Sequence, residues 1–207
     1  MSALLALTGL SFQGFIALLQ GQLAEAQLVG QQMQEITEVI NNPRDSARSE
    51  AMASLIQATM GRYEEAHLEA FAPLASGVLG IQAIGTALTA FGQGYIPLAI
   101  KTVIQAWSVP IALRWPSILF QFIPIVAALL ADRGDFSRAA TLLAMGRAHP
   151  ACPRGWWEIM DLVQKLEARL QAELSPEEYA AAQAHGRELD VGETAVSLLE
   201  ELKAMVG

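Results

Sequence analysis

The sequence predicts an all-α protein built as a stack of antiparallel helical hairpins. Four six-residue segments share the pattern Gly-x-apolar-x-x-Ala, and they begin at Gly21, Gly61, Gly94 and Gly134, at intervals of 33 to 40 residues. Each segment lies between long apolar stretches of helical period, which is typical of the tight corner of a hairpin. A repeat of this length indicates layered helices rather than a globular enzyme.

The residue types of these corners have local physical reasons. Glycine lets the first helix end in the left-handed backbone conformation that other residues adopt at a cost. The apolar third position, which is Tyr63 in GRYEEA and Phe136 in GDFSRA, fills the wedge between the two helices. The closing alanine, Ala66 or Ala139 in these copies, allows the two backbones to approach closely.

Apolar periodicity and stop signals predict about eleven helices in all. The first eight are expected at residues 3–20, 22–40, 43–60, 62–72, 74–91, 95–107, 111–131 and 135–148. Pro73 is expected to end or kink the fourth helix, because proline lacks the backbone N–H and clashes with the preceding turn. Pro110 is expected to open the fourth hairpin. Pro116 and Pro124 are expected to interrupt or bend the helix over 111–131.

The composition changes after the proline-rich segment 149–155, from where the chain becomes more acidic and amphipathic. Helices are expected at 156–173, 176–185 and 191–206. The last two begin with the capping-box patterns Ser175-Pro-Glu-Glu and Asp190-Val-Gly-Glu. We therefore expect hairpin repeats over residues 1–150 and capping helices of the same unit over 151–207.

Composition excludes several classes of function. The chain has 207 residues, 53% of them hydrophobic, and a net charge of −8 with only 13 Lys and Arg. Direct nucleic-acid binding is not expected, because neutralising phosphates requires clustered basic residues. The single cysteine, Cys152, excludes an intrachain disulfide framework and favours a reducing, cytoplasmic location.

The most apolar part of the chain, residues 71–131, carries only Lys101 and Arg114 as charged residues. Arg114 and the prolines and glycines of this stretch oppose insertion into a bilayer. A buried inner repeat, covered by neighbours on both faces, explains the composition better than membrane helices do.

Two corners and the C-terminal segment resemble a known family. GRYEEA and GDFSRA resemble the inter-helix corner of the tetratricopeptide repeat (TPR). The longer intervals, and the lack of that repeat's Trp-Leu-Gly pattern, are closer to the longer-helix repeat of signal-transduction (STAND-type) ATPases, which include maltose-type activators and LuxR-type regulators. Residues 125–202, with GDFSRAATLLAMGRA and the Leu-rich helices after it, are similar to the tail that closes many such regulators.

The resemblance implies a right-handed superhelical stack, a TPR-like α-solenoid, attached behind a nucleotide-binding domain. This chain itself has no Gly-x-x-x-x-Gly-Lys-Ser/Thr loop. As part of such a regulator, the module would sense an effector or act as a scaffold in signal transduction or transcription regulation.

Enzyme chemistry has no support in the sequence. His149 and Cys152 are spaced like two metal ligands, but a zinc site needs three or four ligands. Cys152 as a nucleophile would need a paired base and an activating environment; His149 could serve as the base, but nothing else in the sequence supports this role. No Gly-x-Ser-x-Gly elbow is present, and the acidic clusters fall at corners or on exposed helix faces. We therefore predict no catalytic residue, metal or cofactor.

Aromatic and cationic residues near the apolar repeats are the candidates for a ligand or partner groove. They are Tyr95, Lys101, Trp107, Arg114, Trp115, Trp156 and Trp157. Core packing is the alternative for each aromatic residue. Trp156 and Trp157 are adjacent at a helix start and point about 100° apart. One is expected to anchor the tail helix, and the other is expected to be at least partly exposed.

The predicted function is a cytoplasmic, non-enzymatic module for protein–protein interaction or regulatory scaffolding. It would bind a partner protein or peptide through the groove of the stack, or pack against upstream domains of the same polypeptide. A small-molecule effector-sensing domain is the alternative. The first helix has no charged residue before Glu25, unlike the polar cap of a repeat array. We therefore expect an upstream domain or a homodimer contact there.

Overall fold

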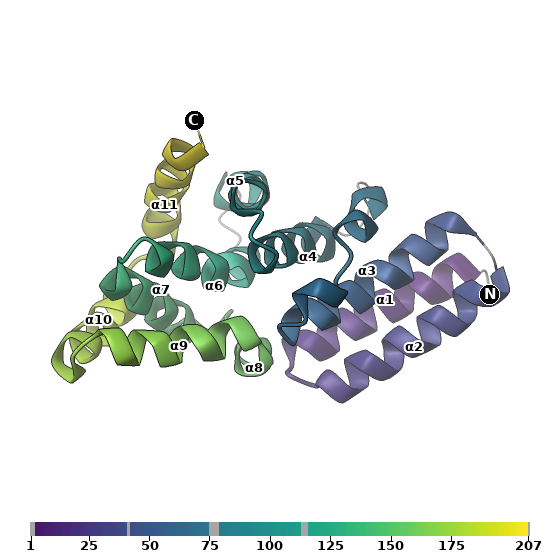
Figure 1. Ribbon diagram of the computed structural model, residues 1–207, viewed down its shortest axis with the longest axis horizontal. Coiled ribbons are helices and arrows are strands. Elements are labelled where there is room, and N and C mark those ends of the chain that lie inside the picture. The colour runs from purple at the N-terminus through teal and green to yellow at the C-terminus, as the bar shows by residue number, and fades with distance from the viewer. Residues whose placement is uncertain (1–2, 41, 75–78, 113–115, 207) are drawn as a thin grey trace.

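The computed structural model is all-α, which confirms that part of the predicted fold (Figure 1). It describes residues 3–40, 42–74, 79–112 and 116–206. These ranges contain eleven α-helices and two short 3-10 helices, and they contain no strand.

The N-terminal part is a three-helix unit of α1 (Ala3–Leu19), α2 (Leu23–Ile40) and α3 (Pro43–Thr59). Each of these helices packs against the other two. Gly14 allows this close approach: a Cβ placed there would lie 3.2 Å from a Val29 methyl and 3.3 Å from the Met52 sulfur. A larger residue in this position would push α1 away from both neighbours.

The predicted helix over 62–72 is wrong. Two 3-10 helices, η1 (Tyr63–Glu65) and η2 (Leu68–Leu74), occupy this segment. Ala66 has extended backbone angles and ends η1, and Pro73 lies within η2 where it cannot donate to an α-helical ladder. The side-chain amide of Gln93 donates to the carbonyls of Tyr63 and Ala66 at 2.8 and 3.0 Å. A tertiary contact thus supplies hydrogen bonds for these carbonyls.

The central part contains two helix pairs, each joined by a tight glycine corner. The helix α4 (Leu79–Gly92) packs against α5 (Ile96–Ala112), and α6 (Pro116–Asp132) packs against α7 (Phe136–Ala148). Pro110 lies inside α5 and does not open the next hairpin, contrary to the prediction. Pro116 is the first residue of α6, where its missing N–H costs no intrahelical bond. Pro124 lies inside α6, which continues past it to Asp132.

The C-terminal part contains α8 (Arg154–Ile159), α9 (Asp161–Glu173), α10 (Pro176–Glu188) and α11 (Val191–Val206). The predicted single helix over 156–173 is therefore two helices, separated by Met160 in an extended conformation. The predicted start of α10 is confirmed, because Ser175 makes both hydrogen bonds of a capping box. Asp190 accepts a 2.8 Å bond from the Glu193 N–H and caps α11.

All four corner glycines have positive φ, between 75° and 85°. At each corner the glycine N–H donates to the carbonyl three residues earlier, and the next N–H donates to the carbonyl five residues before it. This pair of bonds is the Schellman motif, which satisfies carbonyls left over at a helix end. The 6→1 bonds join Gln22 to Ala17, Arg62 to Gln57, Tyr95 to Ala90 and Asp135 to Leu130.

Helices from the N-terminal, central and C-terminal parts contact one another in turn, and the C-terminal part also contacts the first helix. The helix α3 packs against α1 and α4, and α4 packs against α6. The helix α9 packs on α6 and α7, whereas α8 reaches back to α1 (Figure 1). The C-terminal segment therefore connects the middle of the chain to the N-terminal helices, and one continuous core results.

Candidate functional site

The predicted groove residues that the structure describes do not line a common cleft. Tyr95 is 58% exposed at the α4–α5 corner, Lys101 is exposed on α5, and Trp107 is buried in α5. None of these three lines the cleft described below. Arg114 and Trp115 lie outside the described residues.

The prediction that one of the adjacent tryptophans is exposed is wrong, because Trp156 and Trp157 are both fully buried. The Trp156 ring packs edge-on against Phe15 of α1, with centroids 6.0 Å apart. The Trp157 indole N–H donates to the Phe120 carbonyl of α6 at 3.2 Å. The helix α8 is covered by α1 where Trp156 lies and by α6 where Trp157 lies, so both tryptophans are buried. These tryptophans fix the fold and are not available to a partner.

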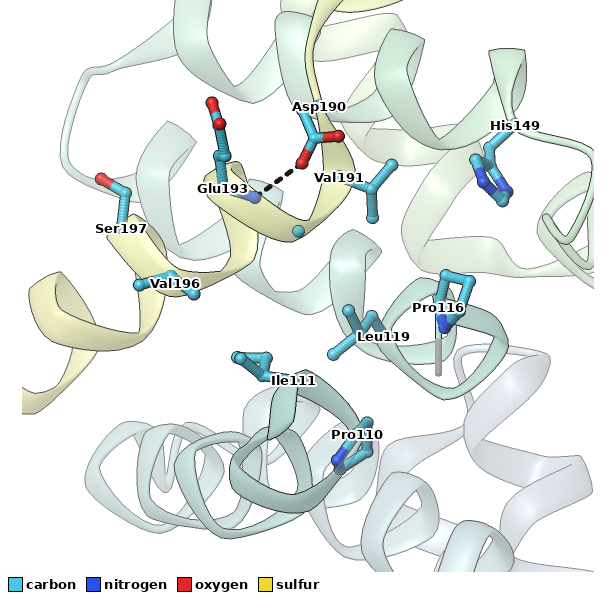
Figure 2. A pocket seen from close by; sticks show the side chains of 11 residues that line it. Pro110, Ile111, Pro116, Leu119, His149, Asp190, Val191, Glu193, Val196 and Ser197 are labelled. Atoms are coloured by element: carbon cyan, nitrogen blue, oxygen red, sulfur yellow. Dashed lines mark hydrogen bonds between the residues drawn. The ribbon is translucent and has the colours of Figure 1, made fainter. Parts of the chain in front are cut away.

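A cleft of about 920 Å³ lies where the end of α5, the start of α6 and the start of α11 meet (Figure 2). Its lining is mostly apolar, and polar groups come chiefly from α11. The residues that line it are Pro110, Ile111, Pro116, Leu119, His149, Asp190, Val191, Gly192, Glu193, Val196 and Ser197. In Figure 2, Ile111 and Leu119 lie on one side of the cleft, and Val191 and Val196 of α11 lie on the other.

An ion-pair cluster holds α11, which forms one wall of the cleft. The Arg138 guanidinium of α7 bonds both carboxylate oxygens of Glu201 of α11, at 2.7 and 3.2 Å. It also contacts Asp135 at 3.1 Å. Hydrogen bonding to Arg138 lowers the pKa of Glu201 below its usual range. The corner before α7 is thereby connected to the C-terminal helix.

Acidic groups line the described part of the cleft. Among the lining residues that the structure describes, Asp190 and Glu193 carry negative charge and none is a lysine or arginine. Asp190 accepts the Glu193 N–H, so the start of α11 is already capped by a carboxylate and is a poor site for an anion. An apolar ligand that carries a positive charge suits this lining better than an acidic one.

The geometry around His149 and Cys152 does not favour catalysis. The His149 Nδ1 accepts the Ala151 N–H at 3.1 Å, and its ring lies 4.7 Å from the ring of Phe120. Burial raises the pKa of the Cys152 thiol to about 11, so the reactive thiolate is scarce near neutral pH. In the described parts of the chain, no three His, Cys, Asp or Glu side chains gather as metal ligands would.

Comparisons with known proteins return no relative. No family model matches the chain, and no significant match is found among curated proteins or solved structures. Within the described ranges, no helix combines the length and the hydropathy that crossing a bilayer requires.

Sequence reasoning missed the cleft because its walls are far apart in the chain. The sequence held one signal: Val196 is an apolar residue on α11 among the polar residues Glu193, Ser197 and Glu200. In the structure its side chain is 49% exposed. A half-exposed valine beside polar residues on an amphipathic helix can mark a contact surface. The sequence alone does not show that Ile111 and Leu119 face it.

Proposed function

We propose that this chain is a non-enzymatic helical-repeat module that binds an apolar segment of a protein partner in the cleft between α5, α6 and α11. The observation that carries the proposal is the cleft itself, whose apolar sides come from three helices and whose described lining includes the carboxylates of Asp190 and Glu193. Grooves of this kind accept apolar side chains of a peptide, and polar rim groups fix its orientation. A basic residue next to the apolar segment would pair with Glu193.

The proposal also includes the arrangement of the helices as a repeat stack. The successive packing of α1, α3, α4 and α6 supports a right-handed superhelical stack of tetratricopeptide type. The resemblance of residues 125–202 to the tails of STAND-type regulators supports a role as the C-terminal arm of a cytoplasmic signalling or transcription regulator. The C-terminal capping helices, beginning at α8, would then complete the same unit.

A peptide-display selection tests the proposal directly. Random peptides selected on the full chain are expected to share apolar residues beside a lysine or arginine. Val196→Arg should abolish their binding, measured by fluorescence anisotropy, because it places a cation on the apolar wall. Val206→Arg is the matched control, since Val206 is 44% exposed on the same helix and does not line the cleft.

Two results would contradict the proposal. One is a selection that enriches no peptide family above background. The other is equal binding of the selected peptides to both arginine variants, which would place them elsewhere on the surface.

A small-molecule effector is the second candidate function. The cleft volume of about 920 Å³ falls in the range of ligand sites in proteins. Calorimetric screening of metabolites would detect saturable heat that is lost in Val196→Arg and retained in Val206→Arg. Loss in an Arg114→Ala variant as well would support the role predicted for that residue from the sequence.

A further inference from the structure

The helix α1 has two faces of different character. On one, Leu7, Ser11, Gly14 and Leu18 are buried against the neighbouring helices. On the other, Leu5, Phe12 and Ile16 are 65%, 47% and 49% exposed. With Gly9, which is also exposed, they follow the 3.6-residue period of a single helix face. We call this set, Leu5, Gly9, Phe12 and Ile16, the α1 stripe.

The α1 stripe carries no charge, and neither does the rest of α1. Two copies of the stripe can therefore meet without repulsion between their own side chains. An anionic membrane is a poor alternative, because interfacial helices need lysine or arginine on the polar face and α1 has neither.

The spacing of the stripe residues is symmetric about its midpoint, between Leu10 and Ser11. A two-fold axis at this point would place Leu5 opposite Ile16 of a second, antiparallel helix, and Gly9 opposite Phe12. The shapes are complementary as well, because a Cβ built on Gly9 meets no atom within 4 Å. A Phe12 ring from the second copy can occupy the space above Gly9.

We infer that the α1 stripe is a self-association surface, which pairs with the α1 stripe of a second copy of this chain in an antiparallel, isologous contact. In such a contact each interaction occurs twice, once on either side of the two-fold axis, so every residue of the stripe has a partner in the second copy. The contact would involve a single face of one helix, which places the dimer among weak interfaces. Association is therefore expected at high micromolar concentration. The inference does not depend on the cleft.

Disulfide trapping tests both the partner and the register. Leu5→Cys and Ile16→Cys chains, mixed and oxidised, should form a mixed dimer. Leu5→Cys alone should not, because antiparallel pairing separates the two copies of position 5 by roughly 16 Å along the axis, too far for a disulfide. Val39→Cys is the control for random collision, since Val39 is 86% exposed on α2. The native Cys152 is buried and should stay reduced.

The expected result is an excess of the mixed dimer over either control of about fivefold or more. The reason is that a preformed contact raises the effective concentration of the two thiols above that given by random collision. Sedimentation of the chain without added cysteines should show reversible dimers that Phe12→Ala removes. Three outcomes would overturn the inference: mixed cross-linking no greater than for Val39→Cys, preferential cross-linking of Leu5→Cys with itself, or monomers at every concentration. Binding to neutral phospholipid vesicles that Phe12→Ala abolishes, without cross-linking, would instead assign the stripe to a lipid surface.

Discussion

The indole N–H of Trp156 donates a 3.0 Å hydrogen bond to the hydroxyl of Thr59, 97 positions earlier in the chain. Both residues are fully buried. Thr59 ends α3 and also donates to the Leu55 carbonyl at 2.9 Å. Its oxygen therefore serves as donor within one helix and as acceptor for another. This bond joins the C-terminal helices to the N-terminal three-helix unit.

Thr59→Val should destabilise the protein by about 1–3 kcal/mol, because it leaves the buried Trp156 N–H without an acceptor. The change is measured as the free energy of unfolding in urea. Thr102→Val is the control, since Thr102 donates to the carbonyl four residues earlier in the same way but accepts no indole. In a double-mutant cycle, Trp156→Phe should cost less in the Thr59→Val background. Strict additivity of the two losses would show that the bond contributes nothing.

Alanine at two equivalent corners should have unequal effects. Gly21 and Gly134 both have positive φ, so each alanine variant has the left-handed strain of about 1–2 kcal/mol. At Gly21 the added Cβ would also lie 2.7 Å from the Gly155 carbonyl oxygen, whereas at Gly134 it would meet nothing within 4 Å. Gly21→Ala should therefore lower the melting temperature further than Gly134→Ala does. Equal losses would mean that α8 does not rest against the first corner.

The stability of the protein should fall as pH rises through the alkaline range. Burial raises the pKa of Cys152 from 9.0 to about 11, so between these values the folded state binds more protons than the unfolded state. Cys152→Ala should remove part of the decline in unfolding free energy between pH 9 and pH 11. The thiol should also react slowly with a disulfide reagent at neutral pH until the chain unfolds. Fast labelling of the folded protein would contradict the burial of this group.

Removing the Arg138 ion pairs should have a modest, pH-dependent effect. Arg138→Met should lower the unfolding free energy by about 0.2–1 kcal/mol near neutral pH, since these groups are partly exposed. The pKa of Glu201 is lowered in the folded state, so its stabilisation is present above the unfolded pKa and is lost as pH falls through the folded one. Urea unfolding of both proteins over a series of falling pH values should show the difference shrink as Glu201 becomes protonated in the folded state. A difference that persists in acid would point to packing by the arginine stem.

The Arg138 variant also bears on the cleft. Because Arg138 holds α11 through Glu201, its loss should weaken binding of peptides selected on the cleft more than it affects overall stability. Lys203→Met is a suitable control, as Lys203 pairs only locally with Glu200 on the same helix. Equal peptide affinity in both variants would show that the wall is positioned by apolar packing alone.

Several local features of this protein could be predicted from its sequence alone. Glycines at 21, 61, 94 and 134 allow a left-handed helix end, and all four are found in that conformation. Ser175 and Asp190 cap α10 and α11 as predicted. These features could be predicted because each depends on a few neighbouring residues, whose dihedral preferences and hydrogen bonds act within one helical turn.

Contacts between distant parts of the chain fix what surrounds these elements. Sequence spacing predicted one exposed tryptophan in α8, but α1 covers one of them and α6 covers the other, so both are buried. No local pattern reveals which helices lie on either side of α8. Residues 62–72 lost their predicted α-helix where Gln93, about thirty positions away, binds the freed carbonyls. The cleft depends on the meeting of α5, α6 and α11. Helical period shows which face of a helix is apolar, but only packing determines what covers that face.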